Sequence, residues 1–290
     1  MKSLHGTLML GNANKVMKFI KSESVHLAVT SPPYFGVNMW GDLNEQLLGI
    51  KNIWWEKEEK AKLIKGERVF NDYLADVWRE SFRVLVPGGR LIINTSDVPS
   101  KQVGMWNNAM QCLTRCKRVG FKHRDTIIWA KGNQHRIQCS YPRPWGIVIA
   151  NTFEYVLVLQ KPGVRDYSKM SKKRIEASKL QAGNEQWILN PIWSIKSASA
   201  KQEKHCAPFP VELVQRLVKL YTYKGDTVLD PYCGTGTTLK VAKEEQRNFI
   251  GIELYEKYFP LISKKVGWND QTLFYPIKYT IRKFKSRIRR

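Results

Sequence analysis

The chain has 290 residues, of which 43% are hydrophobic, and both values are typical of a globular protein with a substantial core. Lysine and arginine number 48 against 25 aspartate and glutamate residues, and the net charge of +23 indicates a polyanionic partner such as nucleic acid. The sequence has no run near the roughly 18 apolar residues of a membrane-spanning helix, and its five scattered cysteines fit reduced thiols. These features argue against a membrane protein, a collagen-like fibre, a disordered tail and a secreted scaffold.

Short apolar runs rich in β-branched residues alternate with amphipathic stretches, which predicts a mostly parallel sheet covered by helices. Residues 1–6 lack the apolar core of a signal peptide, so we expect the chain to stay in the cell. The expected strands are Val25–Thr30, Arg90–Asn94, Thr126–Ala130, Phe153–Gln160, Thr227–Asp230 and Asn248–Ile252.

Helical spacing of apolar residues predicts helices between these strands. The first covers Asp72–Leu85 and is expected to end at the Pro87-Gly88-Gly89 segment, and a second covers Met105–Val119. A third begins with Pro210 in its first turn and is expected to end at Gly225, and a fourth covers Leu239–Glu245.

Two long regions interrupt this alternation. Phe35–Phe70 follows a strand but is polar and charged, and its length predicts a functional excursion. Lys161–Lys204 has little periodicity and many basic residues in its first half, so we interpret it as a separate recognition segment. The C-terminal stretch Lys278–Arg290 has seven basic residues and no acidic one. We expect either this stretch or the cluster Lys169–Lys179 to contact phosphate, the alternative being a solvated surface.

A glycine-rich turn joins a predicted strand to a predicted helix at residues 230–238, which read DPYCGTGTT. Gly234 and Gly236 allow the backbone to approach a ligand closely and present amide groups at the helix N-terminus. Glu253 follows Asp230 by 23 residues, at the end of the next strand, where a carboxylate can accept hydrogen bonds from ribose. The pattern matches neither a Walker loop nor the dinucleotide fingerprint. It predicts a nucleotide-like cofactor, and a plain glycine turn beside a solvated glutamate is the alternative.

A rigid proline corner follows the first predicted strand at residues 30–34, which read TSPPY. Two prolines cannot extend a strand ladder, and their carbonyl groups are free to accept hydrogen bonds. The Ser31 hydroxyl and the Pro32 carbonyl can accept the two hydrogens of an exocyclic amine while Tyr34 stacks on the ring. Taken alone, the same sequence is also compatible with a simple turn.

Residues 30–34 and 230–238 together resemble the catalytic and S-adenosylmethionine-binding motifs of the amino-methylating DNA methyltransferases, which modify cytosine N4 or adenine N6. The catalytic motif comes first and the cofactor motif last, an order that resembles the β group of that family, found in type II restriction-modification systems. The resemblance covers most of Leu8–Ile262. Its further matching segments are Asp72–Asn94, Ile127–Lys131, Glu154–Val158 and His205–Pro210.

The resemblance implies one α/β domain with a circularly permuted Rossmann-like fold, a mostly parallel sheet and helices on both faces. Residues 1–160 would form the catalytic half, with an excursion at 35–70, and residues 205–266 would form the cofactor-binding half. Between them, residues 161–204 would select the target sequence, and residues 267–290 would be a basic tail. The protein would be cytoplasmic, in a prokaryotic cell or encoded by a phage.

The resemblance also implies the cofactor and the site. Ser31, Pro32, Pro33 and Tyr34 would be catalytic, acting on a base flipped out of double-stranded DNA. S-adenosyl-L-methionine would have its charged end near Asp230 and its ribose on Glu253. The other expected cofactor contacts are Thr30, Pro231, Cys233, Gly234, Thr235, Gly236, Thr238, His205 and Phe209.

In the family that the chain resembles, Ser at the position of Ser31 is commoner among cytosine-N4 enzymes and Asp is typical of adenine-N6 enzymes. We therefore expect cytosine N4, with adenine N6 as the alternative. Cytosine C5 methylation requires a nucleophilic thiolate, usually in a Pro-Cys pair, which the chain lacks, and Cys233 lies in the cofactor turn.

Other partners and functions stay open at this point. The resemblance allows a cognate restriction endonuclease, while an RNA substrate or a non-catalytic nucleic-acid-binding protein of the same fold would also explain the charge. Cys112 and Cys116, with His123 and His135 nearby, lack the spacing of a zinc finger, so no metal is expected.

Overall fold

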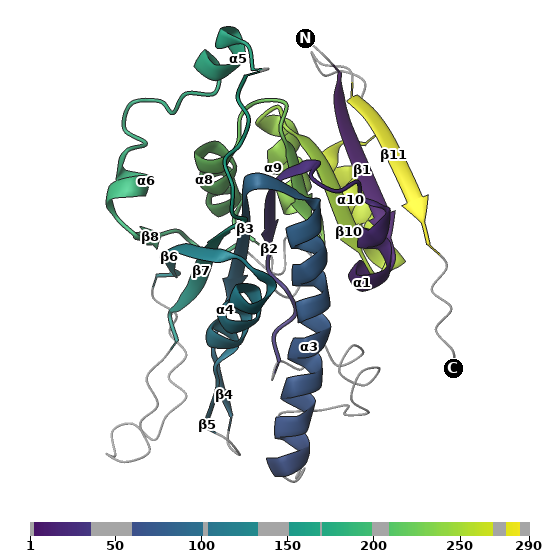
Figure 1. The fold of residues 1–290 in the computed structure, drawn as a ribbon, viewed down its shortest axis with the longest axis vertical. Coiled ribbons are helices and arrows are strands. Elements are labelled where there is room, and N and C mark those ends of the chain that lie inside the picture. Colours follow the sequence, from purple (N-terminus) through teal and green to yellow (C-terminus); the bar gives the residue numbers. More distant parts are fainter. Residues whose placement is uncertain are drawn as a thin grey trace.

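The computed structural model describes residues 3–35, 60–100, 104–132, 151–168, 170–198, 209–268 and 277–284. Within these residues, nine strands form one sheet in the order β11-β1-β10-β9-β2-β3-β7-β6-β8 (Figure 1). Its strands are β1 (Leu4–Leu10), β2 (Val25–Thr30), β3 (Leu85–Thr95), β6 (Lys122–Ala130), β7 (Phe153–Gln160), β8 (Ile192–Ser194), β9 (Thr227–Asp230), β10 (Asn248–Glu253) and β11 (Ile277–Lys283). A separate hairpin pairs β4 (Val98–Ser100) with β5 (Gly104–Trp106).

The sheet is parallel except for β7, which runs antiparallel to both of its neighbours, β3 and β6. Strands from the two ends of the chain lie side by side: β2 pairs with β9 through Leu27 opposite Val228 and Ala28 opposite Leu229. The two halves of the sequence therefore build one continuous sheet, and the predicted α/β architecture with a mostly parallel sheet is confirmed.

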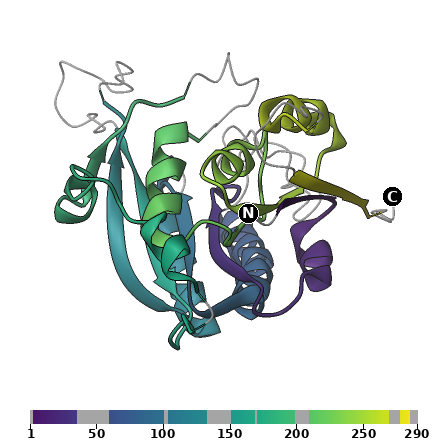
Figure 2. The ribbon, with the colours of Figure 1, turned by 90° about the horizontal axis from the view of Figure 1, so that it is seen from above.

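Helices cover both faces of the sheet (Figures 1 and 2). On one face lie α1 (Ala13–Val16), the short 3-10 helix η1 (Met17–Phe19), α3 (Lys60–Val84) and α4 (Asn108–Val119). On the other face lie α8 (Val211–Tyr221), α9 (Thr237–Glu244) and α10 (Phe259–Val266). The short helices α5 (Lys172–Glu176) and α6 (Gln186–Leu189) belong to the predicted recognition segment, and the 3-10 helix η3 (Glu256–Tyr258) precedes α10.

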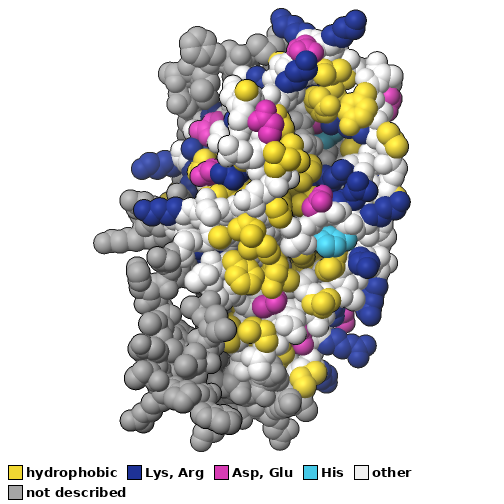
Figure 3. Space-filling model, turned by 90° about the vertical axis from the view of Figure 1, so that its left-hand side faces the viewer, with side chains coloured by type: hydrophobic (Ala, Val, Ile, Leu, Met, Phe, Trp, Pro, Cys, Tyr) yellow, Lys and Arg dark blue, Asp and Glu magenta, His cyan; other side chains and the backbone are white. Residues whose placement is uncertain are grey.

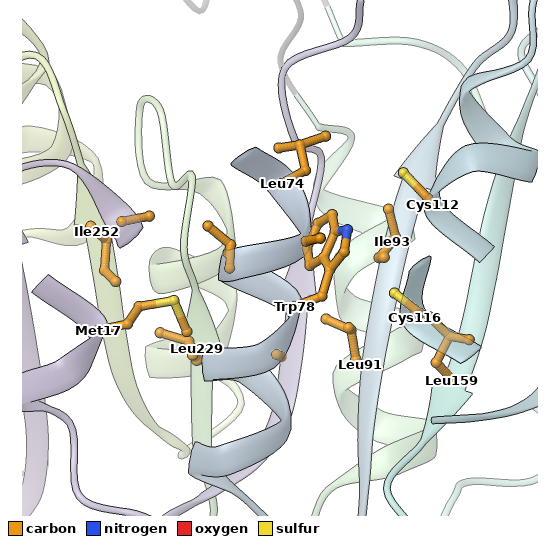
Figure 4. Close-up of a cluster of buried hydrophobic side chains, with 14 of the residues drawn as sticks. Met17, Leu74, Trp78, Leu91, Ile93, Cys112, Cys116, Leu159, Leu229 and Ile252 are labelled. Atoms are coloured by element: carbon orange, nitrogen blue, oxygen red, sulfur yellow. The ribbon is translucent and has the colours of Figure 1, made fainter. Parts of the chain in front are cut away.

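Successive residues of a strand face opposite sides, so each strand contributes to both cores. Leu91 and Ile93 of β3 lie in the core under α3, whereas Ile92 lies in the core under α8. Figure 4 shows the Trp78 ring of α3 directed toward β3, with Cys112 and Cys116 of α4 beyond it. Burial raises the pKa of the Cys112 thiol to about 12, so it is a neutral core side chain.

Several predicted helix boundaries differ from the structure. The helix expected over Met105–Val119 begins at Asn108, because Met105 and Trp106 belong to β5. The helix expected over Asp72–Leu85 begins at Lys60, within the predicted excursion, and ends at Val84. Pro87-Gly88-Gly89 lies inside β3, where the register with β2 is irregular and Gly88 takes a φ of +77°. Likewise α8 ends at Tyr221 rather than at Gly225, because Thr222 is extended and its hydroxyl donates to Val218 O.

Of the strands that the sequence did not predict, β8 and β11 are the two edges of the described sheet, β1 lies between β11 and β10, and β4 and β5 form the separate hairpin. β11 forms within the predicted basic tail and pairs in parallel with β1, and Phe284 stacks on Phe19 with ring centroids 4.7 Å apart. Its lysine and arginine side chains suit an edge strand, where charge discourages further pairing. In the described residues no helix combines the length and apolar character required to cross a membrane.

Candidate active site

The carboxyl ends of β1, β2, β9 and β10 meet at one pocket. From β9 the chain passes through α9 to β10 on one side, while from β2 it passes through α3 to β3 on the other. Neighbouring strands with diverging connections leave a crevice at their carboxyl ends, which is the usual ligand site of such sheets. The lining includes Ser31, Pro33, Phe209, Asp230, Pro231, Cys233, Gly234, Thr235, Thr238 and Glu253, all of them predicted site residues.

The glycine-rich turn curls between β9 and α9. Gly234 has a φ of +52° and Gly236 a φ of +85°, and both values favour glycine. A Cβ at Gly236 would lie 3.2 Å from Ile262 Cγ2, so a side chain there would be both strained and crowded. Gly236 caps α9 without a side-chain hydrogen bond, which leaves backbone N–H groups of the first turn for a ligand.

Asp230 is fully enclosed at the end of β9. Its carboxylate accepts hydrogen bonds from Thr238 Oγ1 at 2.6 Å and from the Tyr232 amide at 3.0 Å. Burial raises the pKa of Asp230 to about 6, although these donors oppose the shift.

Glu253 is buried at the end of β10 and faces the same pocket. Its two carboxylate oxygens accept from the amides of Gly234 and Tyr255, each at 2.9 Å. Burial, with a smaller contribution from the Asp230 charge, raises its pKa to about 7. Two buried acids in one pocket suit a ligand that brings positive charge and hydroxyl donors.

The proline corner forms the other side of the pocket. Thr30 is fully buried at the end of β2, and Ser31 and Pro33 line the pocket. The Tyr34 hydroxyl lies 2.8 Å from Ser31 Oγ and points back toward the sheet, 3.3 Å from Glu154 Oε2. Burial and the charge of Glu154 raise the pKa of the Tyr34 phenol well above its ordinary value, so it is a neutral hydroxyl.

Other predicted site residues have different positions. Three predicted residues do not line the pocket but belong to the proline corner or the glycine-rich turn, namely Pro32, Tyr34 and Gly236. His205 lies outside the described residues. The zinc candidates Cys112 and Cys116 lie in the core, His123 is exposed on β6, and His135 is outside the described residues.

Several pocket residues were missed by the sequence analysis. Asn12 follows β1, caps α1 by accepting from the Asn14 amide at 3.0 Å, and has its side-chain oxygen 3.3 Å from Tyr73 Oη. The available signal was the apolar run at residues 8–10 followed by glycine and a polar residue. Further lining residues outside the prediction are Gly11, Ala13, Tyr73, Tyr232, Thr237, Leu254, Tyr255 and Tyr258.

The predicted recognition segment spans both ends of the sheet. Its first part is held at the amino end of β9, where Arg165 and Arg174 form ion pairs with the fully buried Asp226. Its second part returns to the carboxyl end, where the Ile195 amide donates to Ala130 O at 3.1 Å. The basic helix α5 therefore lies at the end opposite to the pocket (Figure 1).

The face that carries α6 and β8 combines apolar and basic character. Ile188, Leu189 and Ile192 are exposed there, and Figure 3 shows hydrophobic side chains grouped along this face with lysine and arginine around them. Beneath them Arg216 lies 5.3 Å from the ring centroids of both Trp187 and Trp193, which fastens the segment to α8.

Known proteins match the chain over most of its length. The family profile described as DNA methylase, which covers the N6 and N4 methyltransferases, matches residues 25–265. The type II methyltransferase M.MjaI of Methanocaldococcus jannaschii is 35% identical over 276 residues, covering 90% of each chain. The type II methyltransferase M.MthZI of Methanothermobacter thermautotrophicus is 28% identical over 281 residues, covering 92% of this chain and 78% of its own.

Solved structures agree with these relatives. A Thermus thermophilus protein assigned as a DNA modification methylase, in complex with S-adenosyl-L-methionine, superimposes with a TM-score of 0.73 at 30% identity, covering 94% of this chain and 99% of that one. The PvuII cytosine-N4-specific methyltransferase, at 18% identity and a TM-score of 0.65, covers 94% of this chain and 91% of its own and shares the fold. The chain therefore belongs to the DNA methylase family of N6 and N4 amino-methyltransferases, and its cofactor is S-adenosyl-L-methionine.

Proposed function

We propose that the protein methylates the exocyclic N4 amine of cytosine within a short, specific sequence of double-stranded DNA. The observation that carries this choice is Ser31 at the rim of the cofactor pocket, where it stands in place of the aspartate typical of adenine-N6 enzymes. Its neutral hydroxyl can accept one amine hydrogen while the Pro32 carbonyl accepts the other.

The pocket residues suit the cofactor. Bound S-adenosyl-L-methionine supplies an activated methyl group on a positively charged sulfur. Glu253 would accept hydrogen bonds from the ribose hydroxyls, and the ionised Asp230 would face the charged end. The first-turn amides of α9 would bind the carboxylate, next to Lys265, whose Nζ lies 2.9 Å from Thr235 Oγ1.

The corner residues would act on the amine itself. The amine lone pair is delocalised into the ring, so hydrogen bonds to Ser31 and Pro32 that favour a tetrahedral nitrogen make it more nucleophilic. Holding the amine in line with the methyl group then supplies much of the rate by positioning. A base inside a duplex cannot reach this pocket, so the target base must flip out, with Tyr34 replacing its lost stacking.

In the same proposal, residues 161–204 select the target sequence in the DNA. The described part of this segment that reaches the catalytic end, after β8, is the better placed to approach a flipped base than α5 at the other end. The lysine and arginine side chains around this face suit phosphate contacts that position the duplex without reading its sequence.

The test is product identification. The protein is incubated with unmethylated DNA and labelled S-adenosyl-L-methionine, and the DNA is digested to nucleosides for mass spectrometry. 4-Methyldeoxycytidine is the expected product. 6-Methyldeoxyadenosine would overturn the inference from Ser31, and tight DNA binding without any methylated nucleoside would favour a non-catalytic protein of this fold.

A further inference from the structure

A buried polar cluster lies directly behind the proline corner. Glu154 begins this cluster at the start of β7, Asn94 joins it from the end of β3, and Lys131 follows β6. The exposed fractions of Glu154 and Asn94 are 9% and 3%. A carboxylate enclosed to this degree requires partners, and none of the residues in this cluster belongs to the predicted site.

The partners of Glu154 fix the direction of the hydrogen bonds. Its Oε1 pairs with Lys131 Nζ, and its Oε2 accepts from Asn94 Nδ2 and lies 3.3 Å from the Tyr34 hydroxyl. An ionised carboxylate can only accept, so hydroxyl and amide groups facing it must donate. Asn94 accordingly directs its Nδ2 donor group at Glu154. Its Oδ1 atom is buried and has no hydrogen-bond partner in the described part of the chain.

The Tyr34 hydroxyl has one hydrogen and three possible acceptors within reach, which are the Asn94 backbone carbonyl oxygen, Glu154 Oε2 and Ser31 Oγ. The Asn94 carbonyl oxygen lies 3.2 Å away and is neutral, whereas Glu154 Oε2 carries charge and forms the stronger bond. When Tyr34 donates to Glu154, its oxygen is left to accept. Asn94 Nδ2 donates to it at 3.2 Å, and the Ser31 hydroxyl, nearer at 2.8 Å, is positioned to donate to it as well.

This direction decides what Ser31 offers to the pocket. With its hydrogen committed to Tyr34, Ser31 Oγ presents only lone pairs, which is the state that can accept an amine hydrogen. If the order were reversed, the serine hydroxyl would accept from Tyr34 and could turn its own hydrogen toward the amine.

We propose that Glu154 is a positioning residue that acts through Tyr34 to keep Ser31 as a hydrogen-bond acceptor for the target amine. The inference rests on the proposed role of Ser31. A purely structural alternative is that Glu154 only neutralises Lys131 within the fold.

The decisive experiment is a double-mutant cycle on the full-length protein with Glu154→Gln and Tyr34→Phe, read by single-turnover methylation rates. Glu154→Gln keeps the shape of the side chain but replaces one acceptor oxygen by an NH2 donor. We expect the single-turnover methylation rate to fall by about tenfold or more, which is the effect of one misdirected hydrogen bond. The dissociation constant of S-adenosyl-L-methionine and the KM for DNA should stay within about twofold. In the Tyr34→Phe background, Glu154→Gln should have no further effect, because the group it orients is gone.

A matched control separates this role from the loss of an ion pair. Glu23→Gln removes a glutamate that pairs with Lys161 at 3.0 Å at the opposite end of the sheet, and it should retain the wild-type rate. The proposal would be overturned if Glu154→Gln methylated DNA as fast as Glu23→Gln. It would also be overturned if Glu154→Gln lowered the methylation rate by the same factor in the wild-type protein and in Tyr34→Phe.

The remaining outcomes are equally distinct. If Glu154→Gln does not fold, Tyr34→Phe still decides the matter, because a wild-type rate without the hydroxyl would overturn the proposal. A failure of the proposed function would show in the wild-type protein, as a missing or different methylated nucleoside. A failure of this inference would leave that product unchanged.

Discussion

The ionisation of Glu253 couples cofactor binding to pH. Its carboxylate is buried at the end of β10, and its pKa in the free protein is raised from 4.5 to about 7. Ribose hydroxyls and a positively charged ligand favour the ionised form, so binding must release the proton that the free protein holds below this pH. Affinity for S-adenosyl-L-methionine is therefore expected to rise as the pH increases through 7.

The magnitude follows from the two acids. With a pKa of about 7, Glu253 is about one-tenth ionised at pH 6 and about nine-tenths ionised at pH 8, which gives a gain of about tenfold, or about 1.4 kcal/mol. Asp230, with a pKa of about 6, adds about a factor of two over the same range. In the free protein the raised pKa of Glu253 also costs about 3 kcal/mol of folding stability, a cost that develops as the pH rises from about 4.5 to 7.

Isothermal titration calorimetry checks this linkage. Titrations at pH 6.5 in buffers of different ionisation enthalpy should show about one proton released per cofactor bound, summed over the two acids. In the matched variant Glu253→Gln, the number of protons released per cofactor bound should fall to about a quarter. The ligand's own amino group titrates between pH 6 and 8 with either protein, so its contribution cancels when the variant is compared with the wild type. Equal proton release in the two proteins, or wild-type affinity that does not rise relative to the variant, would refute the assignment of Glu253.

Four further predictions address the corner, the turn, the recognition segment and its anchor. Ser31→Ala should lower turnover by about a hundredfold with the cofactor dissociation constant within about twofold, and unchanged turnover would remove Ser31 from the site. Gly236→Ala should weaken cofactor binding by about tenfold and lower the melting temperature, because an L residue is strained there. A dissociation constant and a melting temperature equal to those of the wild-type protein, both measured by calorimetry, would contradict this. Asp226→Ala should reduce the free energy of unfolding in urea by about 3 kcal/mol by leaving two arginines without their buried partner, and a change below about 1 kcal/mol would show that the clamp is not stabilising. Replacing Lys172 and Lys173 by Gln should change DNA affinity by less than about threefold in fluorescence anisotropy at fixed salt, because α5 lies opposite the pocket, and a tenfold loss would place DNA on that end.

The local features of the site could be predicted from the sequence. A glycine pair between a strand and a helix, and two prolines after a strand, restrict the backbone through the chemistry of those residues alone. The pocket accordingly contains Ser31, Pro33, Asp230 and Glu253 where strand ends were expected. The family resemblance was confirmed by a match over residues 25–265, which includes both motifs.

Contacts between distant parts of the chain could not be predicted in this way. Asn12 and Tyr73 reach the pocket only because β1 pairs with β10 and α3 packs on the same face of the sheet as α1, and no local pattern near either residue encodes those neighbours. Glu154 read simply as the start of a strand, yet it lies against the Tyr34 hydroxyl 120 residues away. The amino-acid sequence by itself thus determined six of the nine described strands of the sheet, the two turns and the cofactor class, because backbone restrictions and apolar periodicity are local. Only the tertiary structure decided which partners surround the reacting groups, because burial and hydrogen-bond direction depend on all the elements that pack together.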